Sequence, residues 1–257
     1  MVINRKPPAT LRRTALEVKS YRLLKKVIPA VMGVILAVLT TVFVVAMLYD
    51  HYGSFTVSIN KFDNINFALS LSEAPDFKDV TTRLNSKASK DITNIDGSTL
   101  PGDLDSINGS HNGANYVAYT FYCRNTGKEA CSYEYQLYIA TKTQDIDKAV
   151  RVRLYVDGVA TDYARVGSDG QPEIDYAHPD RDENGMIKIP VTYSLYTTPF
   201  LTESVICRDT IDNLVPGGET RFTVVIWLEG EDPDCVDTIL GGQFKVDMQI
   251  NIIGIEA

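Results

Sequence analysis

Residues 243–252 read QFKVDMQINI, and this stretch shows most clearly how the larger part of the chain folds. Apolar and polar residues alternate along it, the apolar ones being Phe244, Val246, Met248, Ile250 and Ile252. Successive side chains of a β-strand point to opposite faces of a sheet, so this alternation predicts a strand with one buried face.

The same period of two recurs along the chain after residue 49 and defines the fold class. Runs of this kind occur at 54–61, 64–72, 116–124, 131–141, 149–156, 159–166, 186–193 and 220–229. Nine or ten strands with turn residues between them are typical of an all-β domain. We therefore expect an antiparallel β-sandwich or jelly roll.

Two turns of this domain are predicted as β-hairpins. Asp157-Gly158 separates RVRLYV from VATDYARV, and a type I′ turn needs positive φ at both of its central residues. The second hairpin is expected in YTFYCRNTGKEACSYEY, centred on Gly127. In that register Cys123 faces Cys131, so the two thiols would lie opposite each other on adjacent strands.

The cysteines are expected to form disulfides. All four lie after residue 49, in the part of the chain that we place outside the cytoplasm, where disulfides persist. The predicted hairpin pairs Cys123 with Cys131, and by elimination Cys207 would pair with Cys235. Four reduced thiols remain the alternative.

The N-terminal part contains one membrane-spanning candidate. Residues 27–48 read VIPAVMGVILAVLTTVFVVAML and include no charged side chain. Twenty-two residues at about 1.5 Å of rise give a helix of roughly 33 Å, enough to cross the hydrocarbon core of a bilayer. The alternative is a signal peptide cleaved near Ala46, although the apolar run is longer than a usual signal peptide requires.

Charge predicts the orientation of this span in the cell membrane. The first 26 residues carry one acid and eight basic side chains, Arg5, Lys6, Arg12, Arg13, Lys19, Arg22, Lys25 and Lys26, for a net charge of +7. Since the whole chain carries −8, the remainder sums to −15. The positive-inside rule then gives a single-pass protein with residues 1–26 in the cytoplasm, 27–48 in the bilayer and 49–257 outside.

Residues 73–115 differ from the rest of the extracytoplasmic domain. They are rich in Ser, Asn, Asp and Gly and contain few large apolar side chains. We expect a long polar loop at the surface with little structure of its own.

One acidic segment has the spacing of a calcium loop. Asp180, Asp182 and Asn184 precede Gly185 in a D-x-D-x-N-G pattern, which gathers side-chain oxygens around one point. The twelfth position is Val191, where an EF-hand would place a glutamate, so a full EF-hand is excluded. A calcium-stabilised β-loop and an ordinary turn rich in Asp and Asn both remain.

A second acidic segment, EGEDPDCVD, spans residues 229–237. We expect Asp232 to cap a short helix beginning at Pro233, with Gly241 as the left-handed residue after its end. The acids Glu229, Glu231, Asp232, Asp234 and Asp237 are then expected to form a solvated face, with cation binding as the alternative.

No catalytic set stands out in the sequence. The histidines His51, His111 and His178 lack zinc-ligand spacing, and no nucleophile elbow, P-loop or dinucleotide fingerprint occurs. We therefore expect no enzymatic activity, no catalytic residue and no cofactor other than the calcium considered above. A domain at −15 would repel phosphate, so a nucleic-acid partner is not expected.

Three motifs resemble the TasA/camelysin group of exported surface and biofilm-matrix proteins of Gram-positive bacteria. They are Tyr49-Asp50 followed by GSFTVSI, the segment YTFYCRNTG, and the segment PGGETRFTVVIWLEG. The resemblance implies a jelly-roll fold, export by the general secretory route and a role in the cell envelope or in matrix assembly. This chain departs from the group in its expected retained anchor and in its four cysteines, and no zinc signature supports the metalloprotease label of the camelysin branch.

Together these features predict a membrane-anchored, non-enzymatic surface protein with a structural or adhesive role. Its expected partners are the lipid bilayer, through residues 27–48, and other copies of itself or proteins of the cell envelope. The alternative is a carbohydrate- or solute-binding module of the envelope, suggested by the tyrosines of the predicted strands, Tyr116, Tyr119, Tyr122, Tyr133, Tyr135 and Tyr138.

Overall fold

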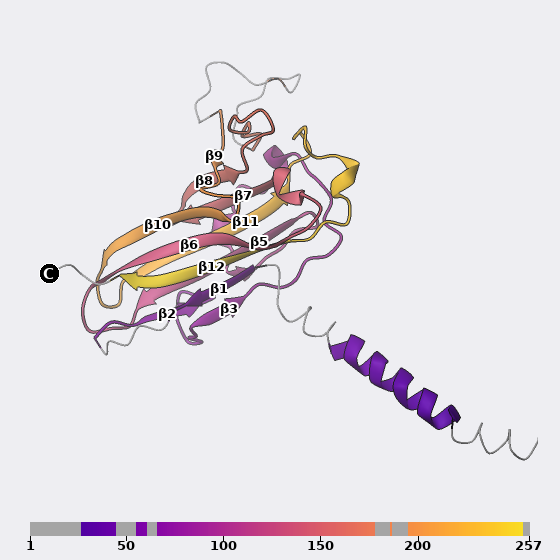
Figure 1. The fold of residues 1–257 in the computed structure, drawn as a ribbon. Helices are drawn as coiled ribbons and strands as arrows, with labels where there is room; N and C mark the ends of the chain where they lie inside the picture. Colours follow the sequence, from indigo (N-terminus) through magenta and orange to yellow (C-terminus); the bar gives the residue numbers. More distant parts are fainter. Residues whose placement is uncertain (1–26, 45–54, 61–65, 178–185, 187–194, 254–257) are drawn as a thin grey trace, which may run out of the picture. The chain divides into compact units, whose positions relative to one another are not determined.

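The computed structural model describes residues 27–44, 55–60, 66–177, 186 and 195–253 (Figure 1). The chain divides into two units, Met1–Asp50 and His51–Ala257, which are described separately below. The first contributes one helix and the second contributes all of the described strands.

The helix of the first unit spans Val27–Val44 and is apolar and long enough to cross a membrane. Its side chains are not buried against other described residues. The hydroxyls of Thr40 and Thr41 donate to the carbonyls of Leu36 and Ala37, at 2.8 and 2.9 Å, so these polar groups are satisfied within the helix. A signal sequence would have the same character, and the predicted residues 45–48 lie outside the described part.

The second unit is built from strands connected by turns and short 3₁₀ helices (Figure 1). The strands are β1 (Phe55–Ile59), β2 (Leu69–Ser72), β3 (Arg83–Asn85), β4 (Gly109–Ser110), β5 (Tyr116–Asn125), β6 (Cys131–Lys142), β7 (Val150–Val156), β8 (Val159–Ala164), β9 (Thr198–Pro199), β10 (Val205–Leu214), β11 (Glu219–Leu228) and β12 (Phe244–Ile253). The 3₁₀ helices are η1 (Gly97–Thr99), η2 (Leu104–Ser106), η3 (Ile146–Lys148) and η4 (Asp237–Ile239).

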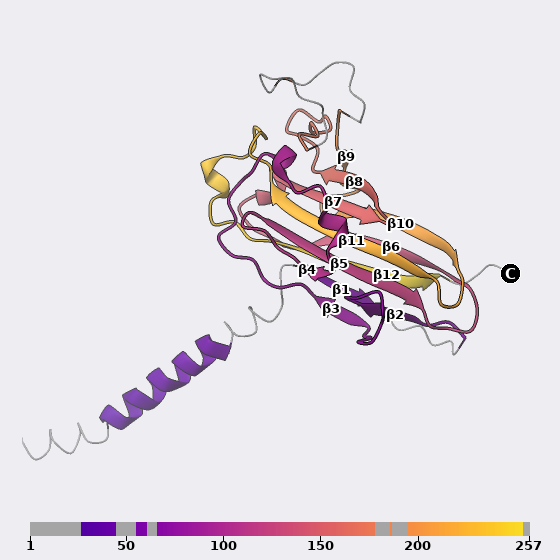
Figure 2. The same cartoon turned by 180° about the vertical axis from the view of Figure 1, so that it is seen from behind.

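These strands form two mixed sheets, which Figure 2 shows from the opposite side. One has five strands in the order β10-β6-β12-β1-β3, and the other has seven, with the path β2-β5-β11-β7-β8-β9 and β4 beside β5. The expectation of purely antiparallel sheets is wrong, because β1 runs parallel to β12 and β8 runs parallel to β9. In both cases a long stretch of chain separates the partners, which a parallel connection requires.

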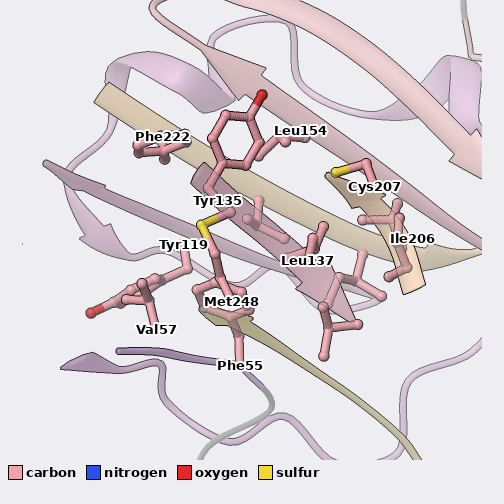
Figure 3. Close-up of a cluster of buried hydrophobic side chains, with 14 of the residues drawn as sticks. Phe55, Val57, Tyr119, Tyr135, Leu137, Leu154, Ile206, Cys207, Phe222 and Met248 are labelled. Atoms are coloured by element: carbon pink, nitrogen blue, oxygen red, sulfur yellow. The ribbon is translucent and has the colours of Figure 1, made fainter. Parts of the chain in front are cut away.

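Alternating side chains from both sheets meet in one buried cluster (Figure 3). The Tyr135 ring of β6 lies 5.1 Å from the Phe222 ring of β11, and the Phe55 ring of β1 lies 6.1 Å from that of Phe121 in β5. Such aromatic contacts add to the stabilisation from buried area. The period of two in the sequence therefore identifies the core-facing residues correctly.

The hairpin predicted at Asp157-Gly158 is confirmed. Val156 pairs with Val159 across the turn, and the φ angles of Asp157 and Gly158 are 49° and 87°. Positive φ at both central residues is what a type I′ turn requires.

The second predicted hairpin is wrong, because β5 and β6 belong to different sheets. Cys123 of β5 lies opposite Leu71 and Thr220, whereas Cys131 of β6 lies opposite Leu214. The turn at Gly127 thus carries the chain from one sheet to the other. The inward-facing residues of β5 and β6 therefore meet across the core and are not paired in one β-ladder.

The four cysteines are free thiols in the structure, so neither predicted disulfide is present. The bridge from Cys123 to Cys131 depended on the hairpin register that the structure does not have, and the pairing of Cys207 with Cys235 depended on the first by elimination. Burial raises the pKa of Cys123 to about 12 and that of Cys207 to about 11.

Candidate functional site

The seven-stranded sheet has a second face, turned away from the shared core, and this face holds the candidate site. Its side chains are the alternate residues of β5, β11 and β7 that do not join the main core. They are Tyr116, Ala118, Tyr122, Arg124, Glu219, Arg221, Val225, Trp227, Arg151, Arg153 and Tyr155. In a solvated sheet such positions would be polar and exposed.

Part of the second face is covered by the loop that the sequence analysis placed at the surface. Leu104 in η2 is 1% exposed and packs with Ala118, Tyr155, Val225 and Trp227 in a separate apolar cluster. The prediction for residues 73–115 is therefore wrong in one respect. Most of the loop lacks regular structure, but Leu104, together with Ile95 and Leu100, buries part of the second face.

Glu229 joins this loop to the sheet. The indole nitrogen of Trp227 donates to Glu229 Oε2 at 3.0 Å, and the backbone N–H of Gly97 donates to the same oxygen at 3.1 Å. A Cβ atom at Gly97 would lie 2.7 Å from that oxygen, so the close approach needs glycine. Burial raises the pKa of Glu229, and the hydrogen bond from Trp227 partly offsets this rise.

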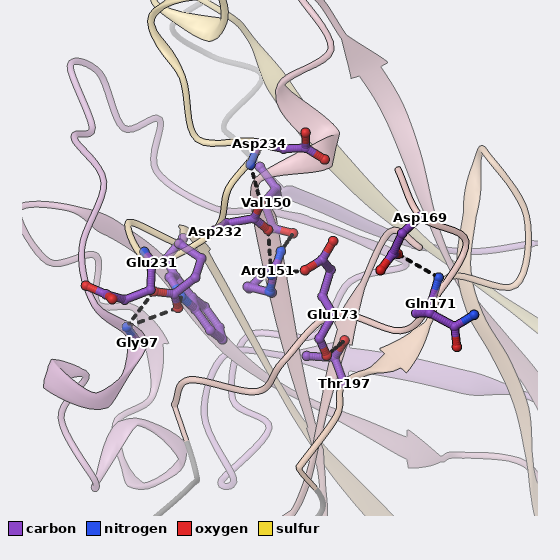
Figure 4. Close-up of polar contacts among 12 residues, drawn as sticks. Gly97, Val150, Arg151, Asp169, Gln171, Glu173, Thr197, Glu231, Asp232 and Asp234 are labelled. Atoms are coloured by element: carbon purple, nitrogen blue, oxygen red, sulfur yellow. Dashed lines mark hydrogen bonds and ion pairs between the residues drawn. The ribbon is translucent and has the colours of Figure 1, made fainter. Parts of the chain in front are cut away.

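Arg151 is the centre of a buried ion cluster at the same end of the face (Figure 4). Its Nη2 lies 2.6 Å from Asp232 Oδ2 and 3.7 Å from Glu173 Oε2. Asp232 Oδ1 also accepts from the backbone N–H of Asp234, at 2.7 Å. The guanidinium on β7 therefore holds two loops against the sheet, the one between β8 and β9, which carries Glu173, and the one between β11 and β12, which carries Asp232.

Three carboxylates of this cluster are close enough to hold a metal ion. Ligand atoms of Glu173, Asp232 and Asp234 all lie within 4.8 Å of one another. Arg151, however, already places a cation against two of them. Burial, followed by the negative charge of Asp232, raises the pKa of Glu173. The geometry matches an internal ion-pair network.

The structure corrects the sequence reading of residues 229–237. Glu229 and Asp232 are buried, at 1% and 4% exposure, and do not belong to a solvated face. The short helix η4 begins at Asp237 after the cap residue Val236, so Asp232 does not cap it. Gly241, with φ of +76°, is the left-handed residue after this helix as predicted.

Two further buried acids are paired with cations. Asp162 accepts from Arg153 Nε at 2.6 Å and from Arg153 Nη2 at 2.8 Å, a bidentate contact between neighbouring strands β7 and β8. Asp147, in η3, accepts from Lys142 and Arg165 at 2.8 and 2.7 Å. Asp147 and Asp162 are 0% and 5% exposed, so removing the cationic partner of either one would leave a buried carboxylate unpaired.

The other end of the second face is open and carries a hollow of about 290 Å³. We call it the Tyr122 hollow; it is lined by Tyr122, Asp157, Glu219 and Arg221. A larger hollow of about 420 Å³ lies between the β6–β7 connection and the loop after β11, and is lined by Gln144, Asp145, Lys148, Asp234, Val236, Thr238 and Ile239. The sequence named one lining residue of each hollow as a candidate for binding, Tyr122 and Asp234, but predicted neither hollow, since the other lining residues come from separate strands and turns.

The predicted calcium ligands Asp180, Asp182 and Asn184 lie outside the described residues. Of the tyrosines named for carbohydrate binding, Tyr119, Tyr133 and Tyr135 are buried in the core. Tyr116, Tyr122 and Tyr138 are half-buried, and of these Tyr122 lines a hollow.

Comparison with known proteins identifies no relative. No family model matches the sequence, and no curated protein matches it. Among solved structures, a β-glucosidase from Kluyveromyces marxianus aligns with 53% of this chain at 11% identity and a TM-score of 0.21. Its complex with glucose aligns with 79% at 10% identity and a TM-score of 0.23. The aligned regions are 11% and 18% of those chains, and scores this low carry no argument.

Proposed function

We propose that this protein is a membrane-anchored, non-enzymatic component of the cell surface with a structural or adhesive role. The observation that carries the proposal is the apolar helix Val27–Val44 followed by a strand-rich domain. The basic residues before the helix favour a cytoplasmic N-terminus, so that the domain is displayed outside the membrane.

The domain is suited to such a role by its construction. We propose that its two sheets form a β-sandwich of the jelly-roll type, supported by the aromatic contacts between β1, β5, β6 and β11. Buried ion pairs hold its long loops on the second face. A rigid domain with fixed loops presents a constant surface to partners, as an adhesive or structural protein requires.

The resemblance to the TasA/camelysin group agrees with this proposal. In that group, exported domains act in the envelope or in the matrix. Under the proposal the helix is retained, so the domain stays tethered and contacts other copies of itself or envelope proteins while attached to the cell.

Topology is tested with the full chain carrying one epitope tag at each end in a Gram-positive host. Protease added to intact cells should remove the C-terminal tag and spare the N-terminal tag, and permeabilised cells should lose both. N-terminal sequencing of the membrane fraction should find no new terminus near Ala46. A protected C-terminal tag, or cleavage at Ala46, would refute the tethered arrangement.

The structural or adhesive role is tested with the purified full chain in detergent micelles or nanodiscs. We expect concentration-dependent association, measured by analytical ultracentrifugation, or retention of protein-coated beads by cells that produce the protein. Protein that stays monomeric at every concentration and retains no beads would contradict the role.

The alternative function is carbohydrate or solute binding in the envelope. The Tyr122 hollow favours it, because this hollow combines an aromatic ring with charged side chains on a rigid sheet.

A further inference from the structure

We infer that the Tyr122 hollow is a subsite for a neutral saccharide. The inference rests on the alternative function of carbohydrate binding and gives it a place and a ligand class. The four lining residues belong to β5, to β11 and to the turn between β7 and β8. The candidate ligand is one hexose unit of a chain without acidic substituents.

Strand pairing fixes the positions of the lining residues. Tyr122 lies directly opposite Arg221, and the backbone N–H of Asp157 donates to the carbonyl of Arg221 at 2.9 Å. Asp157 Oδ1 accepts from the backbone N–H of Arg221 at 2.7 Å, which orients its carboxylate. A site held by a sheet and a tight turn needs little reordering when a ligand binds, and this lowers the entropic cost of binding a sugar.

The aromatic ring of Tyr122 is also held in place. Its hydroxyl donates to Asn108 Oδ1 at 2.8 Å, and its ring meets the edge of the Phe77 ring with 6.4 Å between centroids. The Arg124 guanidinium lies over the Phe77 ring, 3.7 Å from the ring centroid. Tyr122 is half-buried, so part of its ring remains open towards the hollow. The apolar C–H face of a pyranose packs well on such a ring.

The charged groups keep unused hydrogen-bonding capacity. Glu219 contacts Arg124 through Oε1, and Arg221 contacts Asp105 through Nη2 at 2.9 Å. Within the described part of the chain, Glu219 Oε2, Asp157 Oδ2 and Arg221 Nη1 have no partner. These planar groups comprise two acceptors and one donor, and pairs of neighbouring sugar hydroxyls offer the complementary donors and acceptors.

Charge decides the ligand class. The lining holds two carboxylates and one guanidinium, and the domain after residue 26 sums to −15. An acidic saccharide would be repelled, whereas hydroxyls and acetamido groups would not. The larger hollow near Asp234 is the weaker candidate, because its lining contains no aromatic ring among the described residues.

The test uses the full chain in nanodiscs and isothermal titration calorimetry. The probes are cellotetraose, maltotetraose and tetra-N-acetylchitotetraose, with tetragalacturonate as the acidic counterpart. We expect at least one neutral probe to bind with a dissociation constant of about 1 mM or lower, and tetragalacturonate to bind at least about tenfold more weakly.

Variants test whether the saccharide binds at the Tyr122 hollow. Tyr122→Ala and Glu219→Gln should each weaken binding by at least about tenfold, and Tyr122→Phe should retain most of it because the ring is kept. Tyr138→Ala is the matched control, since Tyr138 is also half-buried but lies on β6 in the other sheet. Near-UV circular dichroism shows whether each variant is folded.

Two outcomes would overturn the inference: no binding of any neutral probe at 10 mM (about ten times the weakest expected dissociation constant), or binding that Tyr122→Ala and Tyr138→Ala leave equally unchanged. Either result could occur while the tag experiment still shows a tethered surface domain. Failure of the saccharide subsite is therefore distinguishable from failure of the proposed surface role.

Discussion

Asp162→Leu is the substitution whose effect the structure predicts most directly. It removes the carboxylate that accepts two hydrogen bonds from Arg153, at 2.6 and 2.8 Å. The side chains of the pair are 7% and 1% exposed, so water cannot replace the lost partner. Removing one member of a buried ion pair costs about 3–5 kcal/mol, and we expect a loss of this size in the free energy of unfolding.

The double variant Arg153→Met with Asp162→Leu isolates the pair. Both charges are then absent, so no ion is left buried, and apolar replacements of similar size are often neutral or stabilising. We expect the double variant to recover most of the stability lost in Asp162→Leu, with a coupling energy of at least about 2 kcal/mol between the two positions.

Urea denaturation of the full chain in detergent micelles measures these values. Trp227 is the only tryptophan of the sequence, and its ring lies 5.6 Å from the Arg153 guanidinium, so its fluorescence reports on this region. Asp76→Leu is the control, because the pair of Asp76 with Lys78 lies at the surface, and it should leave the midpoint unchanged. An Asp162→Leu loss below about 1 kcal/mol, or a double variant as unstable as the sum of the single ones, would refute the reasoning.

Three further predictions follow from the second face and the core. Burial raises the pKa values of Glu173 and Glu229, so the folded chain holds these protons more tightly than the unfolded chain. The free energy of unfolding should therefore rise as the pH falls from 7 through the raised pKa values towards about 4.3, and Glu229→Gln should reduce this slope in urea titrations at several pH values. Gly97→Ala should lower the stability by about 1–3 kcal/mol in the same assay, because its Cβ would lie 3.0 Å from Trp227 Nε1 as well as against Glu229, and an unchanged midpoint would contradict this close packing. Iodoacetamide should modify Cys123 only after unfolding, since its pKa is about 12, and mass spectrometry of native protein that shows rapid labelling there would contradict its burial.

The sequence predicted local structure well where each residue's environment follows from its own strand. The period of two in residues 243–252 is matched by β12, whose inward residues Val246, Met248 and Ile250 are buried. The hairpin at Asp157-Gly158 was predictable because positive φ is a local property of the turn. Strand β10 was missed as a continuous strand, since its polar sequence VICRDTIDNL lies at a sheet edge and does not alternate.

Pairing between strands was not predictable from the same pattern. In the register expected around Gly127, Phe121 and Tyr133 both point inward, and they also point inward when β5 and β6 lie in different sheets. Alternation specifies which face is buried but does not name the neighbouring strand. The disulfide between Cys123 and Cys131 was inferred from the expected pairing of these two strands. The strands do not pair, and the two cysteines are free thiols.

The buried arginines show a second limit of prediction from the sequence pattern. In RVRLYV, Arg151 and Arg153 occupy the polar positions of an alternating strand, which normally face water. They are buried because loops distant in sequence cover them and because acids from other elements pair with them: Asp232 lies in the loop after β11, and Asp162 lies on the neighbouring strand β8. Charged side chains in alternation cannot be told from solvated ones until those loops are placed.

The ion pairs also explain why the second face is covered at one end and open at the other. Arg151 and Arg153 have guanidinium groups that are almost fully buried, and this is tolerable only where carboxylates pair with them and loops exclude water. Arg221 and Asp105 form a pair with side chains 33% and 24% exposed, at the point where η2 reaches β11. A pair this exposed remains in contact with water and needs no further cover, so the face can stay open around it. Arg221 links the two ends of the face, because it pairs with Asp105 of the loop and is also one wall of the Tyr122 hollow.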